Sequence, residues 1–216
     1  MGAAMIEVIL CDDHALIRRG IRDTLSDATD IRVVGEAGEY GELRSLMRQQ
    51  RCDVLVLDIN LPGRSGLDVL HALKDEGASA RVLIVSMYPE DQYAIRALRA
   101  GAAGYVNKGG DPQELVQAVR TVAQGRKYVT PEIAQMLVES LTAPPSENPH
   151  ERLSDRELQT LQLIASGKRL SDIADELLLS PKTVSVYRAR VLEKLGLANN
   201  AELTVYAIRN GLVGEG

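Results

Sequence analysis

Three acidic residues and one lysine each follow an apolar stretch of the sequence. Asp58 ends the run Val-Leu-Val-Leu, Asp12 and Asp13 follow a similar run near the amino terminus, and Lys108 follows a short third one. Crowded carboxylates repel one another, and a hard divalent cation such as Mg²⁺ relieves that repulsion through its oxygen ligands. An aspartate beside such a cation can attack phosphorus, because the cation and a nearby lysine neutralise charge on the phosphoryl group. These residues therefore indicate phosphoryl transfer, with Asp58 as the reactive group.

The elements that must position these residues alternate between strands and helices. We expect strands at 6–11, 31–35, 53–58, 81–86 and 104–106, and helices near 15–26, 39–49, 66–75, 90–100 and 111–124. Apolar strands between amphipathic helices predict a parallel sheet covered on both faces, with the carboxyl ends of all strands at one edge. In the doubly wound order 2-1-3-4-5, the first and third strands are neighbours where ligands bind. This α/β fold would gather the acids, Lys108 and Ser86 at that edge.

The last third of the chain has no strand-like run and predicts a smaller all-α domain. A further helix is expected at 131–141, and residues 142–150 contain three prolines without apolar periodicity, which indicates a linker. Four helices are then signalled by their caps, namely Ser154 with Glu157, Ser171, Ser180 with Pro181, and Asn199 or Asn200. Glycines at 167, 196 and 211 are expected to end three of these helices.

The segment 170–188 predicts a helix-turn-helix whose second helix begins at Pro181. Its inward stripe is formed by Ile173, Ala174, Leu177, Leu179, Val184, Val191, Leu192 and Leu195. Residues 151–216 carry nine basic and nine acidic side chains, yet 181–195 has a local excess of three positive charges. Such a helix fits the major groove of double-stranded DNA, where its first turns meet base edges while Lys and Arg hold phosphates.

Composition excludes several classes of protein. The net charge of −5 argues mildly against nucleic acid as a partner of the whole chain, and no apolar run approaches the roughly 20 residues that span a bilayer. The first five residues lack the regions of a signal peptide, so we expect a cytoplasmic protein without a membrane segment. Cys11 and Cys52 have no ligand neighbours at metal spacing and predict neither zinc nor a disulfide. His14 is expected to be a surface residue.

Residues 5–125 resemble the receiver domain of response regulators. The residues that carry the resemblance are Asp12, Asp13, Asp58, Ser86 and Lys108 after their strands, the loop Asn60-Leu61-Pro62-Gly63, and Gly66. The resemblance implies a flavodoxin-like fold in which Asp58 accepts phosphate from a kinase phosphohistidine, assisted by Lys108 and Ser86. It also implies that Asp13, Asp58 and the Asn60 backbone carbonyl ligate Mg²⁺, with Asp12 acting through water. Ser86 and Tyr105 match the family's switch positions, so that movement of Ser86 would let Tyr105 turn inward.

Residues 153–212 are similar to the LuxR-type DNA-binding domain. The matching motifs are Leu153-Ser-Asp-Arg-Glu157, Ile164-Ala-Ser-Gly167, Ile173-Ala174, Leu179-Ser180, Thr183-Val184 and Lys194-Leu195-Gly196. The resemblance implies contacts to phosphates or bases from Lys182, Thr183, Arg188, Arg190 and Lys194, and groove-facing positions for Ser185, Val186 and Ala189. Ser185 and Tyr187 depart from the residues often seen there, so the base preference does not transfer.

Both halves together resemble the NarL/FixJ family, with residues 126–152 as a helix and linker between them. The resemblance implies a transcription regulator rather than an enzyme, phosphorylated on Asp58 by a cognate sensor histidine kinase. Phosphorylation would control homodimer formation and sequence-specific DNA binding, with the helix at 200–210 as the candidate dimer surface and RNA polymerase as a further partner. One alternative is a magnesium-dependent phosphohydrolase, although Asn60 stands where the haloacid dehalogenase pattern expects a second acid. A phosphorelay module whose helix-turn-helix binds protein is another.

A purely structural interpretation also exists for each residue of the acidic site. Asp12 or Asp13 could cap the next helix, Asp58 could simply end a strand, Ser86 could satisfy a backbone group, and Lys108 could be a solvated charge. Taken singly, each of these readings would be preferred. Their joint placement at one sheet edge favours the chemical interpretation.

Overall fold

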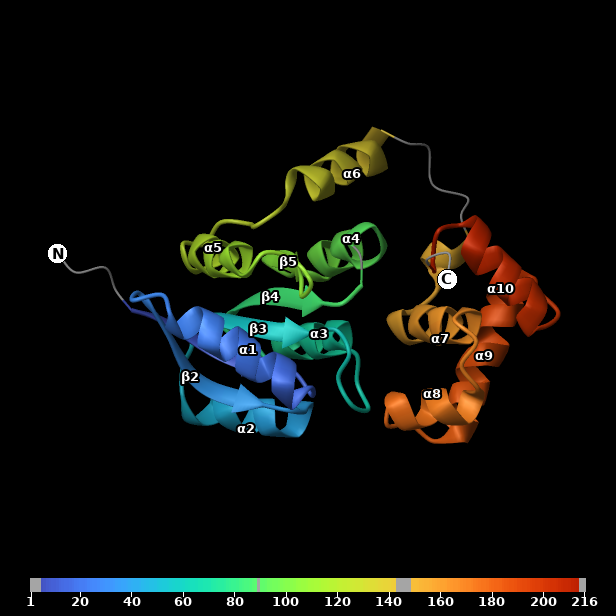
Figure 1. The fold of residues 1–216 in the computed structure, drawn as a ribbon, viewed down its shortest axis with the longest axis horizontal. Helices are drawn as coiled ribbons and strands as arrows, with labels where there is room; N and C mark the ends of the chain where they lie inside the picture. Colours follow the sequence, from blue (N-terminus) through green and yellow to red (C-terminus); the bar gives the residue numbers. More distant parts are fainter. Residues whose placement is uncertain (1–4, 89, 143–148, 214–216) are drawn as a thin grey trace. The chain divides into compact units, whose positions relative to one another are not determined.

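The computed structural model describes residues 5–88, 90–142 and 149–213, which form two compact units that divide after Thr142. The first unit is built around five strands: β1 Ile6–Cys11, β2 Ile31–Ala37, β3 Val54–Asp58, β4 Arg81–Ser86 and β5 Gly104–Asn107. Their order is β2-β1-β3-β4-β5, and all neighbours are parallel (Figure 1). The predicted strand order is confirmed. The chain therefore brings the carboxyl ends of β1, β3, β4 and β5 to one edge.

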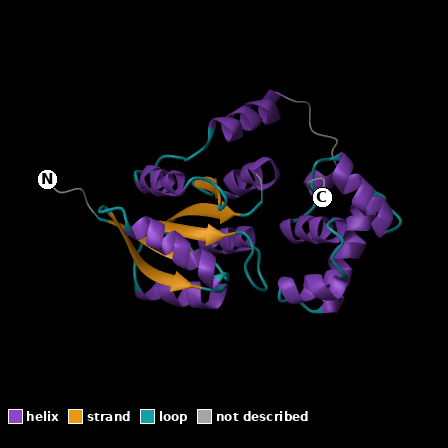
Figure 2. Cartoon of the chain, viewed as in Figure 1, coloured by secondary structure: helices purple, strands orange, loops and turns teal. Residues whose placement is uncertain are grey.

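Helices cover both faces of this sheet (Figure 2). They are α1 Ala15–Ser26, α2 Tyr40–Gln49, α3 Gly66–Asp75, α4 Glu90–Ala100 and α5 Pro112–Ala123. Alternate strand residues such as Val8, Val56 and Val85 form one core with side chains from α1 and α5. The intervening residues, such as Leu55 and Ile84, are equally buried. Burial on both faces explains why the strands read as continuous apolar runs.

The segment after α5 packs against the first unit. Tyr128 pairs with Gly104 as an isolated parallel bridge, and a Cβ on Gly104 would lie 2.9 Å from the Tyr128 Cβ. This close approach requires glycine at the start of β5. The next helix, α6 Pro131–Thr142, contacts α4, and its Ile133 is fully buried.

The second unit is entirely helical among its described residues. It contains the 3₁₀ turn η1 Pro149–Arg152 and the helices α7 Asp155–Ala165, α8 Leu170–Glu176, α9 Pro181–Leu195 and α10 Asn200–Arg209. Helix α7 contacts α8, α9 and α10, and α8 contacts α9 as a helix-turn-helix requires. Residues 143–148 of the predicted linker lie outside the described residues.

Most of the predicted helix boundaries in this unit are confirmed. Ser154 and Glu157 form a capping box, Ser180 caps α9 with Pro181 as its first residue, and Asn199 caps α10. The prediction that Ser171 caps α8 was wrong, because the helix begins at Leu170 and Ser171 lies inside its first turn. The first turn is held instead by Arg169 and Asp172, whose Nε and Oδ2 atoms are 3.0 Å apart. Gly167, Gly196 and Gly211 adopt positive φ, as expected for residues that end helices.

None of the helices in the described part of the chain combines the length and the apolar character that a bilayer-crossing segment needs. The two cysteines are not disulfide-bonded; Cys11 is buried and Cys52 is half-buried.

Candidate functional site

The ends of β1, β3 and β5 bring two carboxylates and one ammonium group together. Lys108 Nζ lies 2.7 Å from Asp12 Oδ2 and 2.7 Å from Asp58 Oδ2. The side chain of Lys108 is 3% exposed, and both aspartate side chains are 2% exposed. A buried ion pair of this kind loses much of its hydration, so each partner depends strongly on the other. The sequence predicted that Asp12, Asp58 and Lys108 gather at one edge of the sheet, and the structure shows them in direct contact.

Asp13 and His14 form the more open side of the acidic site. Asp13 is partly buried, and its Oδ1 lies 2.7 Å from the His14 Nδ1. His14 is a surface residue as expected, with 59% of its side chain exposed, but it borders the acids. Its backbone N–H also donates to Asp12 Oδ1 at 2.8 Å. We did not anticipate this contact from the sequence, although the adjacency of His14 to Asp13 was the available signal.

The acidic site has the oxygen ligands that a divalent cation needs. Asp12, Asp13, His14 and Asp58 each present one ligand atom, and these four atoms lie within 4.8 Å of one another. Buried oxygens of the three aspartates, namely Asp12 Oδ2, Asp13 Oδ1 and Asp58 Oδ2, accept no hydrogen bond of regular geometry within the described residues. Three carboxylates facing one lysine leave an excess of negative charge. The residues therefore fit a hard cation such as Mg²⁺.

Burial changes the protonation of Asp58. It raises the pKa of this carboxyl to about 6, opposed by the positive charge of Lys108 and reinforced by the negative charge of Asp12. A hydrogen bond from the Asn60 backbone also lowers the pKa, by a smaller amount. At neutral pH the carboxylate is still mostly ionised, yet it is poorly solvated. Poor solvation leaves its oxygens available for attack on an electrophile.

The loop after β3 is held close to Asp58 by a glycine and a helix cap. A Cβ on Gly66 would lie 2.1 Å from the Asp58 carbonyl oxygen, so only glycine lets α3 begin against the end of the strand. Ser65 caps α3 by accepting from the Asp68 backbone N–H at 3.2 Å. Asn60 pairs with Ser65 in an isolated antiparallel bridge. These contacts fix the backbone of Asn60 beside the site.

Ser86 and Tyr105 both contact the backbone of Tyr88, in the loop between β4 and α4. Ser86 Oγ accepts from the Tyr88 N–H at 3.1 Å, and Tyr105 Oη donates to the Tyr88 carbonyl at 2.7 Å. Both side chains are fully buried. Tyr105 therefore already occupies an inward position in this structure, whereas the resemblance implied that it turns inward only when Ser86 moves.

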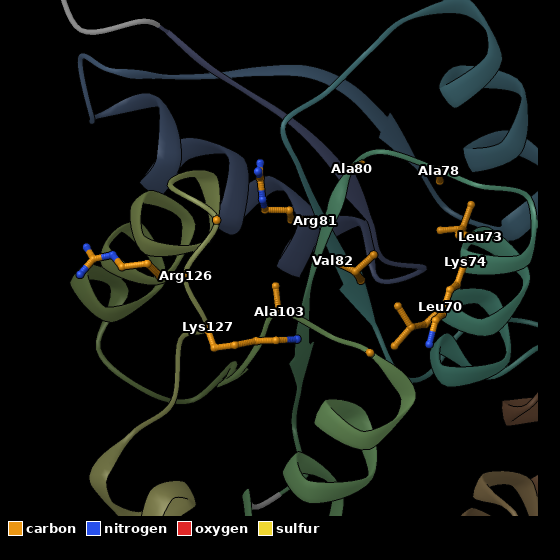
Figure 3. A pocket seen from close by; sticks show the side chains of 12 residues that line it. Leu70, Leu73, Lys74, Ala78, Ala80, Arg81, Val82, Ala103, Arg126 and Lys127 are labelled. Carbon is orange, nitrogen blue, oxygen red and sulfur yellow. The ribbon is translucent and has the colours of Figure 1, made fainter.

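One hollow in the first unit lies away from the acids. A cavity of about 330 Å³ is lined by Leu70, Leu73, Val82 and Ala103 at the amino-terminal end of β4 and β5. Figure 3 shows Lys127 extending along this cavity, and its ammonium group donates to the Ala102 carbonyl. Asp58 lies at the opposite end of the sheet. The acidic site is thus defined by charge and burial rather than by a large cavity.

Helix α9 presents an outward face in the second unit. Five of the predicted DNA-contacting residues are exposed on it, namely Lys182, Ser185, Val186, Ala189 and Arg190. Val186 keeps 43% of its side-chain surface exposed, while Val184 and Val191 are fully buried against the rest of the unit. The helical period places the buried and the exposed sets on opposite sides of α9.

The other three predicted contact residues have partners inside the second unit. Thr183 Oγ1 lies 2.8 Å from the capping Ser180 Oγ, and Arg188 Nε donates to Asn200 Oδ1 at 2.5 Å. Lys194 Nζ lies 2.6 Å from Oε2 of Glu157, which is buried. Although burial opposes it, hydrogen bonds from Lys194 and from the Ser154 backbone hold the pKa of Glu157 below its ordinary value. Lys194 is therefore exposed but already paired within the second unit.

Comparisons with known proteins agree with both units. The family model for the response regulator receiver domain matches residues 8–120, and the model for bacterial regulatory proteins of the luxR family matches residues 151–207. The chain is 40% identical to the response regulator GacA of Pseudomonas protegens over 209 residues, covering 97% of this chain and 98% of that protein. It is also 40% identical to the response regulator UvrY of Escherichia coli K12 over 209 residues, covering 96% of each.

A solved structure extends the comparison to a DNA complex. RcsB from Salmonella enterica serovar Typhimurium, bound to the promoter rprA in the presence of the phosphomimetic BeF₃⁻, is 28% identical with a TM-score of 0.64. That match covers 94% of this chain and 98% of the RcsB chain.

Proposed function

The chain belongs to the NarL/FixJ family of two-component response regulators, and from this premise we propose that phosphorylation of Asp58 by a sensor histidine kinase controls its binding to DNA. The family consists of transcription regulators rather than enzymes. The observation that carries the proposal is the position of Lys108 Nζ, 2.7 Å from both Asp12 and Asp58. We assign the phosphoacceptor domain to residues 5–125, the linker region to 126–152 and the DNA-binding domain to 153–212.

The proposed chemistry is transfer of a phosphoryl group from a phosphohistidine of the kinase. A carboxylate oxygen of Asp58 attacks phosphorus, the new P–O bond forms as the P–N bond breaks, and the imidazole leaves. Lys108 is placed to pair with the oxygens of the incoming group. Asp13, Asp58 and the Asn60 carbonyl would hold Mg²⁺, with Asp12 acting through water. When bound, the cation supplies positive charge that offsets the carboxylates and the phosphoryl oxygens.

The proposed switch begins at Ser86. A phosphoryl group adds roughly −1.5 to −2 charges and strong acceptor oxygens, to which the Ser86 hydroxyl can donate. Turning toward the phosphoryl group would take Ser86 Oγ away from the Tyr88 N–H that donates to it. Loss of the bond between Ser86 and Tyr88 loosens the loop that Tyr105 also holds. A change from 1:99 to 99:1 between two conformations requires about 5.5 kcal/mol of differential stabilisation. We therefore expect some activity before phosphorylation.

The second unit is proposed to bind double-stranded DNA through α9. Lys182 and Arg190 would hold phosphates, while Ser185, Val186 and Ala189 face the bases. Arg188 uses only its Nε atom in the bond to Asn200, so its terminal nitrogens can reach a phosphate. For Thr183 and Lys194, contact with DNA remains an expectation from the resemblance alone, because both side chains already have partners within the second unit.

We propose a homodimer that forms through α10. Val205 and Ile208 are 47% and 46% exposed on this helix and lie three residues apart, on one side. Two copies would engage two half-sites about one helical turn apart on DNA, which multiplies weak single contacts. RNA polymerase is the proposed further partner. Because the proposed ligand is DNA and the proposed partner is a kinase, we propose that the protein is located in the cytoplasm.

The coupling between Asp58 and DNA can be tested with genomic DNA fragments selected by the chain itself. Treatment with a small-molecule phosphodonor and Mg²⁺ is expected to tighten binding of the unchanged chain in gel shifts. Asp58→Asn should abolish the response to phosphodonor, since an amide cannot accept the group. The control is Asp53→Asn, which changes an exposed aspartate before β3 that accepts from the Glu7 backbone. A response that persists in Asp58→Asn would contradict the proposal.

A further inference from the structure

We propose that Asn107 is a positioning residue for phosphoryl transfer, because its side-chain amide ties together the two loops that carry Ser86 and Lys108. The inference rests on the proposed role of Asp58. Asn107 is the last residue of β5 and is paired in register with Ser86, the last residue of β4. Its side chain is half-buried and lies one residue before the lysine that contacts Asp58.

The amide uses both of its ends. Asn107 Oδ1 accepts from the Gly109 N–H at 2.7 Å, and Nδ2 donates to the Tyr88 carbonyl at 3.1 Å. The first bond lies in the loop between β5 and α5, and the second reaches the loop between β4 and α4. A single side chain therefore bridges the two loops beside the acidic site.

Lys108 needs such a support because glycines follow it. Gly109 and Gly110 permit many backbone conformations, and ordering them costs more entropy than ordering other residues. Lys108 must nevertheless hold Nζ 2.7 Å from two buried carboxylates. The Lys108 N–H donates to the Ser86 carbonyl at 2.8 Å, which fixes the near end of the loop. The bond from Gly109 to Asn107 fixes the far end.

Only an amide side chain at position 107 can make both bonds of the bridge. Alanine at position 107 would remove both bonds, and aspartate would keep an acceptor for Gly109 but lose the donor to the Tyr88 carbonyl. That carbonyl keeps its second donor, Tyr105 Oη, in either variant. The bond that has no substitute is therefore the one to Gly109, and its loss falls on the segment that aims Lys108.

The test compares Asn107→Ala with the unchanged full-length chain in two measurements. Amide hydrogen exchange at Gly109 is expected to become at least about tenfold faster, because one net hydrogen bond is lost. The rate of Asp58 labelling by a small-molecule phosphodonor, at saturating donor and Mg²⁺, should fall by about tenfold for the same reason. Asn107→Asp should restore slow exchange at Gly109. Magnesium affinity, followed by amide chemical shifts, should change by less than about threefold, because the Asn107 side chain contacts no predicted ligand.

Asp111→Ala is the matched control. It removes another bond between a side chain and the backbone in the same loop, to the Gln113 N–H at 2.9 Å, and leaves the Asn107 bridge intact. We expect its labelling rate to stay within about twofold of the unchanged chain. Unchanged exchange at Gly109 in Asn107→Ala would overturn the stabilising bond from Gly109 to Asn107, and with it the positioning role. Faster exchange with an unchanged labelling rate would overturn the positioning role. A failure of the unchanged chain to be labelled at Asp58 would instead overturn the proposed function, and the positioning role with it.

Discussion

The acidic site and the outward face of α9 use internal contacts in opposite ways. At the acidic site, function is inferred from residues that contact one another, because Asp12, Asp58 and Lys108 are almost fully buried in a shared ion pair. On α9, the best candidates are residues without internal partners in the described structure, such as Lys182 and Arg190. The difference teaches that a buried charge needs a functional explanation when its partners converge. An exposed charge is functional only if something outside the chain binds it.

Removal of Lys108 is the strongest way to break this comparison. Lys108→Ala leaves two buried carboxylates without a counter-charge, so the free energy of unfolding of the first unit is expected to fall by roughly 3–5 kcal/mol at pH 7. Urea denaturation followed by amide signals of the sheet measures this change. Arg44→Ala, which breaks an exposed pair with Glu76, should cost less than about 1 kcal/mol. If the two substitutions lowered the free energy of unfolding equally, the claim that burial strengthens the dependence of the acidic site on Lys108 would be refuted.

Neutralisation of Asp58 should act in the opposite direction. Burial raises the pKa of Asp58 from 3.8 to about 6, so the folded chain holds this proton more tightly than the unfolded chain. This contribution to stability is present below pH 4 and is lost as the pH rises to about 6. Without Mg²⁺, Asp58→Asn is therefore expected to be more stable than the unchanged chain by on the order of 3 kcal/mol above pH 7. Denaturation between pH 4 and 8 should show the gap opening with pH; a constant gap would contradict the raised pKa.

The smallest expected effects come from the basic residues of α9, where Lys194 is paired with Glu157 and Lys182 and Arg190 are exposed. Lys194→Ala deprives the buried Glu157 of its charged partner and should lower the free energy of unfolding by about 1–3 kcal/mol. Lys182→Ala combined with Arg190→Ala should leave stability within about 0.5 kcal/mol. It should reduce the slope of log binding constant against log salt by about 1.8, since each phosphate contact contributes about 0.9. An unchanged slope in the double variant would mean that neither residue contacts a phosphate.

Much of the fold could be predicted because its signals are local. Apolar runs between amphipathic segments gave the strands, and the handedness of the crossovers placed Asp12, Asp58 and Ser86 at one edge. Caps at Ser154, Ser180 and Asn199 were readable for the same reason. The start of α8 was not, since its N-cap is Arg169, which makes no side-chain cap bond, while Ser171 has the residue type of a cap but lies inside the first turn.

The contacts that depend on distant residues could not be predicted. Glu157 and Lys194 are 37 positions apart, so nothing local showed that the lysine pairs with a buried carboxylate. The burial of Tyr105 depends on the Tyr88 carbonyl, 17 positions away, and the bridge made by Asn107 depends on the same atom. The residue types in a sequence show which side chains could bind a ligand or a partner. Only the packing of the folded chain shows which of them already have a partner within the protein.

Mapping of the phosphorylated residue tests the central claim most directly. The full-length chain would be treated with a small-molecule phosphodonor, with Mg²⁺ or with a chelator, and the modified residue located by mass spectrometry after borohydride trapping of the acyl phosphate. We expect one modified residue, Asp58, that is labelled with Mg²⁺ and not with the chelator. Labelling of a different residue, or labelling of Asp58→Asn to the same extent as the unchanged chain, would contradict Asp58 as the phosphoacceptor.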